Sequence, residues 1–350
     1  MNKKGSFSDT LKSIPQNIFS GFVVSLIALP LGLGLAIASE APPLAGIIAA
    51  VAGGIVVSLF GGSNVTIAGP GNGLVIVLLA SITTLGEGNL FEGYLFTLAA
   101  IILSGVLLFL FGVLRLGAMS EFFPATALQG MLAAIGIGIL AKQFHIMLGI
   151  RSVSGGTIEQ LMAIPDSFLN FLAFHPFSGI LGFLSLVFLF LYGRIRNPYF
   201  HLIPAPMWVV VASIGIGYYY NLVLNQPTPI ESELLIKIPD QLFTNLPRPN
   251  FSKWLDFDFL GVVISITLVA NIESLLSIKA VDKLDPKKRR SNVNKDLRAL
   301  GLASIVSGFL GGLNVVTVIA RSSVNVNNGG SNRSANFFHA AFLVLFVVFL

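Results

Sequence analysis

The sequence predicts an all-α integral membrane protein, and three observations lead to this fold class. Hydrophobic residues make up 54% of the 350 positions and charged residues only 11%, whereas a soluble domain carries about 25% charged residues. The mean hydropathy is +0.85. Long apolar segments recur along the chain, and the basic residues are concentrated in a few loops between them. This pattern is typical of membrane orientation, so the basic pI does not indicate nucleic-acid binding.

A membrane-spanning helix needs about 20 largely apolar residues, and fewer where it is broken or ends inside protein. About eleven segments fit this description. They are 18–39, 43–60, 70–85, 91–114, 125–144, 177–192, 203–224, 259–281, 297–313, 317–326 and 334 onward. The third and the tenth are short. The last stays apolar up to Leu350, so we expect the natural protein to contain further spans.

Lysine and arginine predict the orientation of these segments. Basic residues precede the first segment, follow the fourth and the sixth, and fill the loop 283–298. All of them fall on one side of the membrane if the N-terminus is cytoplasmic. The opposite loops, which include Glu40, Glu87 and 152–166, carry few positive charges. The proline-rich stretch 225–258 is interpreted as an external link between two halves, with a boundary near residue 255.

A short phrase occurs twice, 250 positions apart. Residues 59–66 read LFGGSNVT, and residues 309–316 read FLGGLNVV. Each copy ends a long apolar segment and precedes one of the two short segments. Interrupted segments at matching places in two halves of a membrane protein are typical of a binding site between half-helices. The repeat therefore predicts such a site after each phrase.

The residues after the first phrase, 65–73, read VTIAGPGNG. β-Branched residues followed by this glycine-rich turn favour a short extended piece and then a helix that begins near Pro70 or Gly73. Irregular backbone at membrane depth occurs only where it is buried or lines a cavity. A helix that starts there directs N–H groups and its positive dipole end toward an anion. The alternative is an apolar surface turn. The glycine pattern does not indicate a nucleotide site, because no Lys-Ser/Thr pair follows it and it does not lie in a βαβ unit.

The residues after the second phrase, 314–323, read NVVTVIARSS and begin in the same extended way. An arginine in an apolar region usually faces a polar cavity or a partner, and the planar guanidinium of Arg321 suits an oxyanion such as sulfate, bicarbonate or a carboxylate. Two alternatives stay open at this stage. Arg321 could lie at the membrane edge and extend to water, or it could form a structural ion pair with Glu273.

Glu273 is the one carboxylate deep inside a long apolar segment, and Ser277 lies one turn further along the same face. Such a carboxylate is functional by default: it can carry a proton, or it can help to hold Na⁺. A structural ion pair with Arg321 or Lys279 is the alternative. No cysteine is present, and the four histidines lack a second ligand at metal spacing, so we expect structural roles for them and no metal site. No nucleophile or cofactor motif makes a case for an enzyme.

Several motifs together carry a resemblance to a known family. They are Phe60-Gly61-Gly62 with Pro70, Glu273-Ser274-Leu275-Leu276, Gly308-Phe309-Leu310-Gly311-Gly312 with Ala320-Arg321-Ser322, and Asn328-Gly329-Gly330. The chain resembles the SulP (sulfate permease) family of inorganic anion transporters over essentially all its length. The resemblance implies two inverted repeats of seven spans, shared with uracil-permease-like transporters, usually followed by a cytoplasmic STAS domain. Residues 1–255 would then form the first repeat with its linker. Residues 256–350 would form part of the second, with the later spans and the STAS domain absent.

The resemblance also implies a site between the facing ends of spans three and ten, each preceded by a short strand. The matching anion-binding positions are Pro70, Gly71, Asn72, Gly73, Ala320, Arg321 and Ser322. Glu273 matches an acidic position associated with H⁺ or Na⁺ coupling, and Ser277 matches a hydroxyl that can assist Na⁺. Gly71 replaces a threonine that can bind Na⁺ in bicarbonate-transporting relatives. This departure weakens the Na⁺-coupled bicarbonate interpretation, and a glutamate at 273 favours protons.

We therefore expect a secondary active transporter of a small inorganic anion, with sulfate as substrate and H⁺ or Na⁺ as coupling ion. It would be a multi-pass protein of the bacterial inner membrane, in contact with lipid but not with nucleic acid, with no cofactor, and dimeric like its family. Alternatives are bicarbonate, chloride or dicarboxylate transport, a passive anion channel, and a sensor whose activity lies in the missing part. A nucleobase carrier is disfavoured by Arg321.

Overall fold

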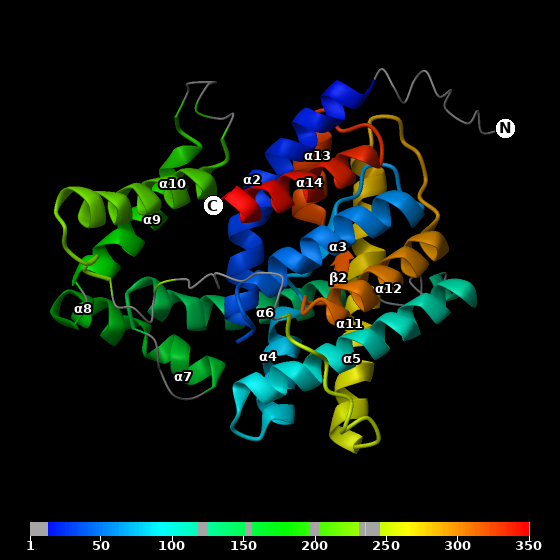
Figure 1. Cartoon of the computed structure of the whole chain (residues 1–350), viewed down its shortest axis with the longest axis horizontal. Helices are drawn as coiled ribbons and strands as arrows, with labels where there is room; N and C mark the ends of the chain where they lie inside the picture. Colours follow the sequence, from blue (N-terminus) through cyan, green and yellow to red (C-terminus); the bar gives the residue numbers. More distant parts are fainter. Residues whose placement is uncertain are drawn as a thin grey trace. The chain divides into compact units, whose positions relative to one another are not determined.

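The structure is a computed structural model that describes residues 13–117, 125–150, 156–174, 176–195, 200, 203–230, 235 and 246–349. These residues form helices connected by short loops, with one pair of short strands (Figure 1). The chain divides into two compact units. The first unit comprises Met1–Gln129 and Pro239–Leu350, and the second comprises Gly130–Ile238.

The first unit contains a helix at each predicted apolar segment of its sequence. These helices are α2 (Ile14–Ala38), α3 (Leu44–Phe60), α4 (Val75–Gly86), α5 (Leu90–Val113), α11 (Phe257–Leu284), α12 (Val293–Phe309), α13 (Ile319–Asn327) and α14 (Ser334–Phe349). Helices from the two ends of the chain lie side by side: α12 packs against α5 and α3, and α14 packs against α2 and α3. Both short segments are confirmed as short helices, of 12 residues in α4 and 9 in α13.

Glycine allows the close packing of α5 against α12. A Cβ on Gly105 would lie 2.8 Å from the carbonyl oxygen of Gly301, and a Cβ on Gly301 would lie 2.5 Å from the carbonyl oxygen of Gly105. No side chain fits at either distance. Small residues at helix contacts are the usual means by which membrane helices approach closely. This contact positions α12, and with it the second repeated phrase, beside the first half of the unit.

The second unit contains most of α6 (Ala125–Met147), then α7 (Thr157–Met162), α8 (Ile164–Phe174), α9 (Pro176–Tyr192) and α10 (Ala205–Tyr218), which continues as the π-helix η3 (Tyr219–Val223). The stretch 152–166, predicted as a connection between membrane segments, is largely helical in its described part, which contains α7 and the start of α8. Pro165 stands in the first turn of α8, where its missing N–H breaks no helical hydrogen bond. Residues 151–155 lie outside the described structure.

Among the described residues, four helices are each long and apolar enough to cross a membrane: α2, α5, α10 with η3, and α11. A fifth span results if α8 and α9 are counted as one bent span. The helices α3, α4 and α14 are apolar but shorter. Helices below about 20 residues fit a membrane protein when they end inside it. The predicted total of about eleven spans stays a prediction.

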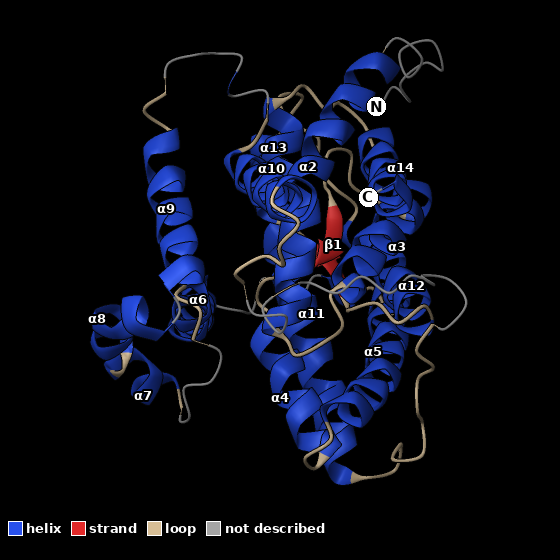
Figure 2. Ribbon diagram, turned by 60° about the vertical axis from the view of Figure 1, so that its left-hand side comes forward, coloured by secondary structure: helices blue, strands red, loops and turns tan. Residues whose placement is uncertain are grey.

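The two strands predicted before the half-helices are confirmed. Strand β1 (Ala68–Pro70) pairs antiparallel with β2 (Val315–Thr317), and Gly69 stands opposite Val316. All six residues are buried. Strand β1 packs against α3 and α2 (Figure 2), while β2 packs against α11, α12 and α3. Pairing satisfies backbone groups that would otherwise be exposed at membrane depth, and it brings the segment after the first phrase against the end of the second phrase.

Candidate functional site

Two helices begin at the strand pair. Strand β1 leads through residues 71–74 into α4, and β2 leads through Val318 into α13. Because the strands are antiparallel, the helices leave in opposite directions, and Figure 1 shows α4 and α13 on opposite sides of β2. Neither N-cap residue, Leu74 or Val318, supplies a side-chain hydrogen bond. Each helix start therefore keeps N–H groups and a positive dipole end for another partner.

Arg321 lies in the first turn of α13 and is 1% exposed. Its Nε, Nη1 and Nη2 atoms have no hydrogen-bond partner within the described part of the chain. The guanidinium lies against Gly69 of β1, at a position that a Cβ on residue 69 would overlap. Taking an unpaired charge out of water costs several kcal/mol. The arrangement therefore favours a bound anion at this place.

Two buried polar residues of α14, one near Arg321 and one at strand β1, were not among the predicted site residues. His339 is fully buried, neither ring nitrogen has a described partner, and its ring is close enough to interact electrostatically with Arg321. Asn336 accepts a hydrogen bond from the backbone N–H of Ala68 (3.2 Å), while its Nδ2 has no described partner. The only available sequence signal was a pair of polar residues within an apolar segment.

Glu273 projects from α11 toward the other helix start. Its Oε1 accepts a hydrogen bond from the backbone N–H of Gly73 (3.3 Å), and its buried Oε2 has no described partner. A carboxylate at this position interacts favourably with the dipole of α4. Neither Arg321 nor Lys279 forms an ion pair with Glu273 within the described structure, so the interpretation of Glu273 as half of a structural ion pair is not supported.

Glycine at 71 leaves space for this carboxylate. A Cβ on Gly71 would lie 2.6 Å from Glu273 Oε2 and 2.6 Å from a methyl carbon of Val316. A threonine would therefore have to displace the carboxylate or the strand β2. Gly69 and Gly71 are two residues apart along an extended backbone, a separation of about 7 Å. Arg321 and Glu273 thus approach neighbouring points of one segment without pairing.

The remaining predicted residues have different environments. Pro70 is buried in β1 opposite Val315, Asn72 is exposed in the turn before α4, and Ala320 is exposed at the start of α13. The Ser322 hydroxyl donates to the carbonyl of Val318 (2.7 Å) and accepts from the N–H of Ile67 (2.9 Å). These hydrogen bonds hold α13 against the first phrase. Ser277 is buried one turn beyond Glu273 on α11.

Other contacts hold the first repeated phrase in place. Asn325 of α13 donates to the carbonyl of Val65 (2.8 Å) and accepts from the hydroxyl of Ser20 on α2 (2.7 Å). Asp296 at the start of α12 accepts from the N–H of Gly62 (2.7 Å) and from the N–H and hydroxyl of Ser63. Residues from distant parts of the sequence therefore hold the backbone that leads into β1 and α4.

Two of the four histidines, for which structural roles were predicted, lie among the described residues. His145 fits this prediction, because its ring bonds the Ser167 hydroxyl (2.7 Å) and the Gln160 carbonyl (2.9 Å). His339 differs, since it is buried in α14 beside Arg321 and does not lie at a segment end. His175 and His201 lie outside the described residues. The part of the chain that the structure describes contains no cluster of three or more metal-ligating side chains.

A family model described as the sulfate permease family matches residues 14–350. The chain belongs to the sulfate permease family. It is 27% identical over 341 residues to a putative sulfate transporter, YvdB, of Bacillus subtilis (strain 168), covering 96% of this chain and 60% of that protein. It is 28% identical over 346 residues to the bicarbonate transporter BicA of Picosynechococcus sp., covering 97% and 58%. The chain thus spans about 60% of the length of these relatives.

Solved structures show the same fold. The transmembrane domain of a cyanobacterial bicarbonate transporter, BicA, matches with a TM-score of 0.79 at 24% identity, over 96% of this chain and 82% of that one. Murine Slc26a9, an anion transporter in an inward-facing state, matches with a TM-score of 0.79 at 17% identity, over 100% and 61%. The predicted helical membrane transporter fold and the family are therefore confirmed.

Proposed function

We propose that the full-length protein moves a small inorganic anion across the membrane by secondary active transport, and that sulfate is the substrate. The observation that carries this proposal is the buried guanidinium of Arg321, which has no described partner beside the uncapped start of α13. An oxyanion can accept charge-assisted hydrogen bonds from a planar guanidinium and from N–H groups at a helix start. It would therefore offset the cost of burying Arg321.

The anion site is proposed to lie on the α13 side of the strand pair. In an α-helix the first three N–H groups lack an intrahelical acceptor, and Ser322 is the first residue of α13 whose N–H bonds back to Val318. The N–H groups of Ala320 and Arg321 thus face the same region as the guanidinium. His339 and the Nδ2 of Asn336 are proposed as additional donors. Ser322 positions the helix through its hydroxyl, and 70–73 complete the site from the α4 side.

Glu273 is proposed as the group that binds the coupling ion. Its Oε2 is buried without a described partner, so a proton there would remove the cost of the buried charge. Na⁺ prefers several oxygen ligands, and Gly71 offers no side-chain oxygen beside Glu273, while Ser277 lies one turn away on α11. Proton coupling is therefore the favoured form of the proposal. The anion and the proton would bind near one strand segment and offset each other's charge.

The wider architecture is part of the same proposal. Residues 1–255 form the first repeat of seven spans and 256–350 part of an inverted second repeat, with further spans and a STAS domain in the natural protein. Transport proceeds by movement of one structural unit against another around the fixed site, as in other inverted-repeat transporters. The protein functions as a homodimer in the bacterial inner membrane with its N-terminus in the cytoplasm.

Uptake of radiolabelled sulfate into liposomes that hold the full-length protein tests this proposal. An inward proton gradient is expected to drive accumulation above the equilibrium level, and a Na⁺ gradient is not. Bicarbonate is the second candidate, because a relative that is 28% identical is named a bicarbonate transporter. Failure of sulfate uptake together with gradient-driven bicarbonate uptake would show that the substrate is bicarbonate and not sulfate. A linear flux that ignores both gradients would contradict active transport and indicate a channel.

A further inference from the structure

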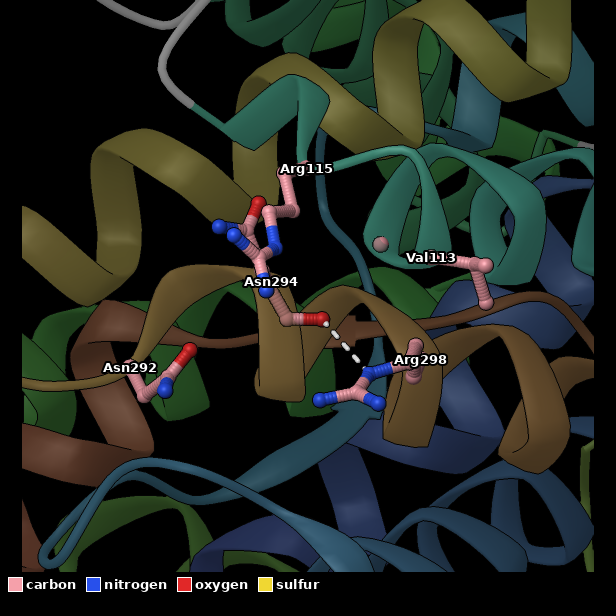
Figure 3. A pocket seen from close by; sticks show the side chains of 6 residues that line it. Val113, Arg115, Asn292, Asn294 and Arg298 are labelled. Carbon is pink, nitrogen blue, oxygen red and sulfur yellow. Dashed lines mark hydrogen bonds between the residues drawn. The ribbon is translucent and has the colours of Figure 1, made fainter.

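A basic pocket lies at the end of α5 and the start of α12, within the first unit. It has a volume of about 430 Å³ and is lined by Gly112, Val113, Arg115, Asn292, Asn294 and Arg298. Figure 3 shows these side chains around the opening, with Asn294 between the two arginines. The lining contains two positive charges and no acidic residue. Such a pocket is suited to an anion, and nothing in the proposed transport mechanism uses it.

Arg115 holds an unusual backbone conformation at this pocket. It follows the last residues of α5 with a φ of 61°, in the left-handed region. Glycine is the usual residue at this position after a helix, and another residue costs about 1 kcal/mol there. The Arg115 side chain has no ion pair or hydrogen bond in the described structure. The turn therefore presents an unpaired guanidinium although glycine would suit its backbone better.

The guanidinium of Arg298 is held at one nitrogen and can bind a ligand through the others. Its Nε donates to the carbonyl of Asn294 one turn earlier (3.4 Å), as the dashed line in Figure 3 shows. This bond leaves both terminal nitrogens for a ligand. Gly112 permits the close approach of α5 and α12, because a Cβ there would lie 2.6 Å from the Asn294 carbonyl oxygen. Asn294 Oδ1 also accepts from the N–H of Gly117 (2.9 Å), which holds the turn beside the pocket.

The surface beside the pocket is apolar and exposed. Leu110 is 43% exposed, Val113 49% and Leu114 66%. These residues lie at the end of a helix that is long enough to span a membrane, next to Arg115. The basic loop 283–298 lies at the same end of the unit, and the positive-inside rule places that end at the cytoplasmic leaflet. A phosphate in the pocket would have an acyl-chain surface next to it.

We propose that this pocket binds the phosphate group of an anionic phospholipid, held between Arg115 and Arg298. Two guanidinium groups provide geometrically matched donors for phosphate oxygens. The adjoining apolar residues accommodate the acyl chains, which a soluble phosphate does not possess. Basic pockets between membrane helices on the cytoplasmic side are known binding places for anionic headgroups. Bound lipid would link the end of α5 to the start of α12.

Thermal unfolding of the purified full-length protein in a neutral detergent tests this proposal. The unfolding midpoint is measured against increasing phosphatidylglycerol, phosphatidylcholine or inorganic phosphate. Wild type is compared with the double variant Arg115→Gly, Arg298→Gln. Arg290→Gln is the control for loss of one exposed basic residue. Arg115→Gly alone is included because glycine suits the backbone of that turn, so this variant is expected to fold.

Phosphatidylglycerol is expected to raise the midpoint of wild type and of Arg290→Gln. The double variant should need about 30-fold more lipid for the same shift in midpoint. The loss of two contacts of about 1 kcal/mol each weakens binding by this factor. An equal response of the double variant and wild type would overturn the site. Equal protection by phosphatidylcholine would overturn its preference for anionic lipid. Protection by inorganic phosphate that the double variant abolishes would assign the pocket to a soluble anion instead.

Discussion

The starts of α4 and α13 meet the same strand pair but differ in charge. At α4, the N–H of Gly73 already bonds the carboxylate of Glu273, so the positive end of this helix faces a negative group. At α13, the buried guanidinium of Arg321 adds a positive charge to the positive end of the helix, and no described side chain balances it. Two helix starts that follow paired strands are therefore proposed to bind ions of opposite sign.

The difference arises because the charged group at each helix start has a different origin in the chain. Glu273 is 200 residues from Gly73, whereas Arg321 belongs to the helix whose start it faces. The repeated backbone supplies a general electrostatic preference for anions at both places. Single side chains then reverse this preference at one place and strengthen it at the other. Substitutions of Glu273 and Arg321 therefore test whether these two side chains set the charge preference of each helix start.

The largest effect is expected for Arg321→Gln. Removing the guanidinium leaves only the helix start to hold the anion, and truncation of one member of a buried charged pair costs about 2–5 kcal/mol. Sulfate uptake at subsaturating concentration should fall at least about 30-fold. Without substrate, the unfolding midpoint should stay equal or rise, because an unpaired buried charge is lost.

Arg290→Gln, which changes an exposed arginine in the loop 283–298, is the matched control and should retain uptake. If Arg321→Gln transported sulfate like wild type, the α13 side could not be the anion site. A large fall in its substrate-free unfolding midpoint would instead assign a structural role to Arg321.

The second prediction concerns coupling through Glu273→Gln. The Gln Oε1 can still accept the Gly73 hydrogen bond, so the fold should be retained, but residue 273 can no longer exchange a proton. Gradient-driven accumulation should be lost, whereas exchange of labelled for unlabelled sulfate at equilibrium should continue within about threefold. Accumulation in response to a proton gradient by this variant would show that protons are coupled elsewhere.

The third prediction concerns the space beside the carboxylate. Gly71→Thr places a side chain 2.6 Å from Glu273 Oε2 and Val316, and such overpacking costs about 1–3 kcal/mol. We expect a lower unfolding midpoint and roughly tenfold slower uptake. Gly34→Ala on α2 is the control, because a Cβ there meets nothing within 4 Å. Unchanged uptake that becomes dependent on Na⁺ would contradict the steric argument and show that the added hydroxyl completes a cation site.

The smallest effect is expected outside the membrane, at Asp285 after the end of α11. Burial raises the pKa of Asp285, but hydrogen bonds from Arg289 and from the N–H groups of Lys287 and Arg289 outweigh burial and lower it overall. A lowered carboxyl pKa stabilises the fold above the unfolded-state value, and this contribution is lost as the pH falls through the folded-state pKa.

Arg289→Gln should therefore lower the unfolding midpoint at pH 7, by less than about 1 kcal/mol in free energy because the pair is partly exposed. Its difference from wild type should persist down to about pH 4, near the ordinary pKa of an aspartate, and shrink as the pH falls further, through the lower folded-state pKa of Asp285. A difference that is independent of pH would show that the Arg289 hydrogen bond to the Ser331 carbonyl (2.9 Å), and not the carboxylate of Asp285, accounts for the effect.

Local sequence patterns were sufficient for most of the fold. Apolar segments of sufficient length predicted the helices of the first unit, because the bilayer imposes length and composition on any spanning helix. β-Branched residues beside glycine predicted both strands, and the repeated phrase located them. The helices α7 and α8 were missed because 152–166 is shorter and more polar than a membrane span, so no length rule applied to it.

The candidate site could be predicted only in part from local sequence patterns. Arg321 and Glu273 stood out because charge in an apolar segment is costly and needs a reason. The sequence did not show how these two residues are related, because it left an ion pair between them open. In the structure Glu273 bonds the N–H of Gly73, and Arg321 lies beside Gly69 and near His339. The steric reason for glycine at 71 also required the position of α11.

The sequence by itself therefore determined the membrane class, the helical segments, the two strands and the two charged residues at the helix starts. Only the tertiary structure decided which groups lie beside each charge, such as Gly73 at Glu273 and His339 of α14 near Arg321. The physical reason is that hydropathy and propensity act over a few neighbouring residues. Contacts between residues 200 or more positions apart, such as Gly73 with Glu273 or Ala68 with Asn336, depend on how whole helices pack.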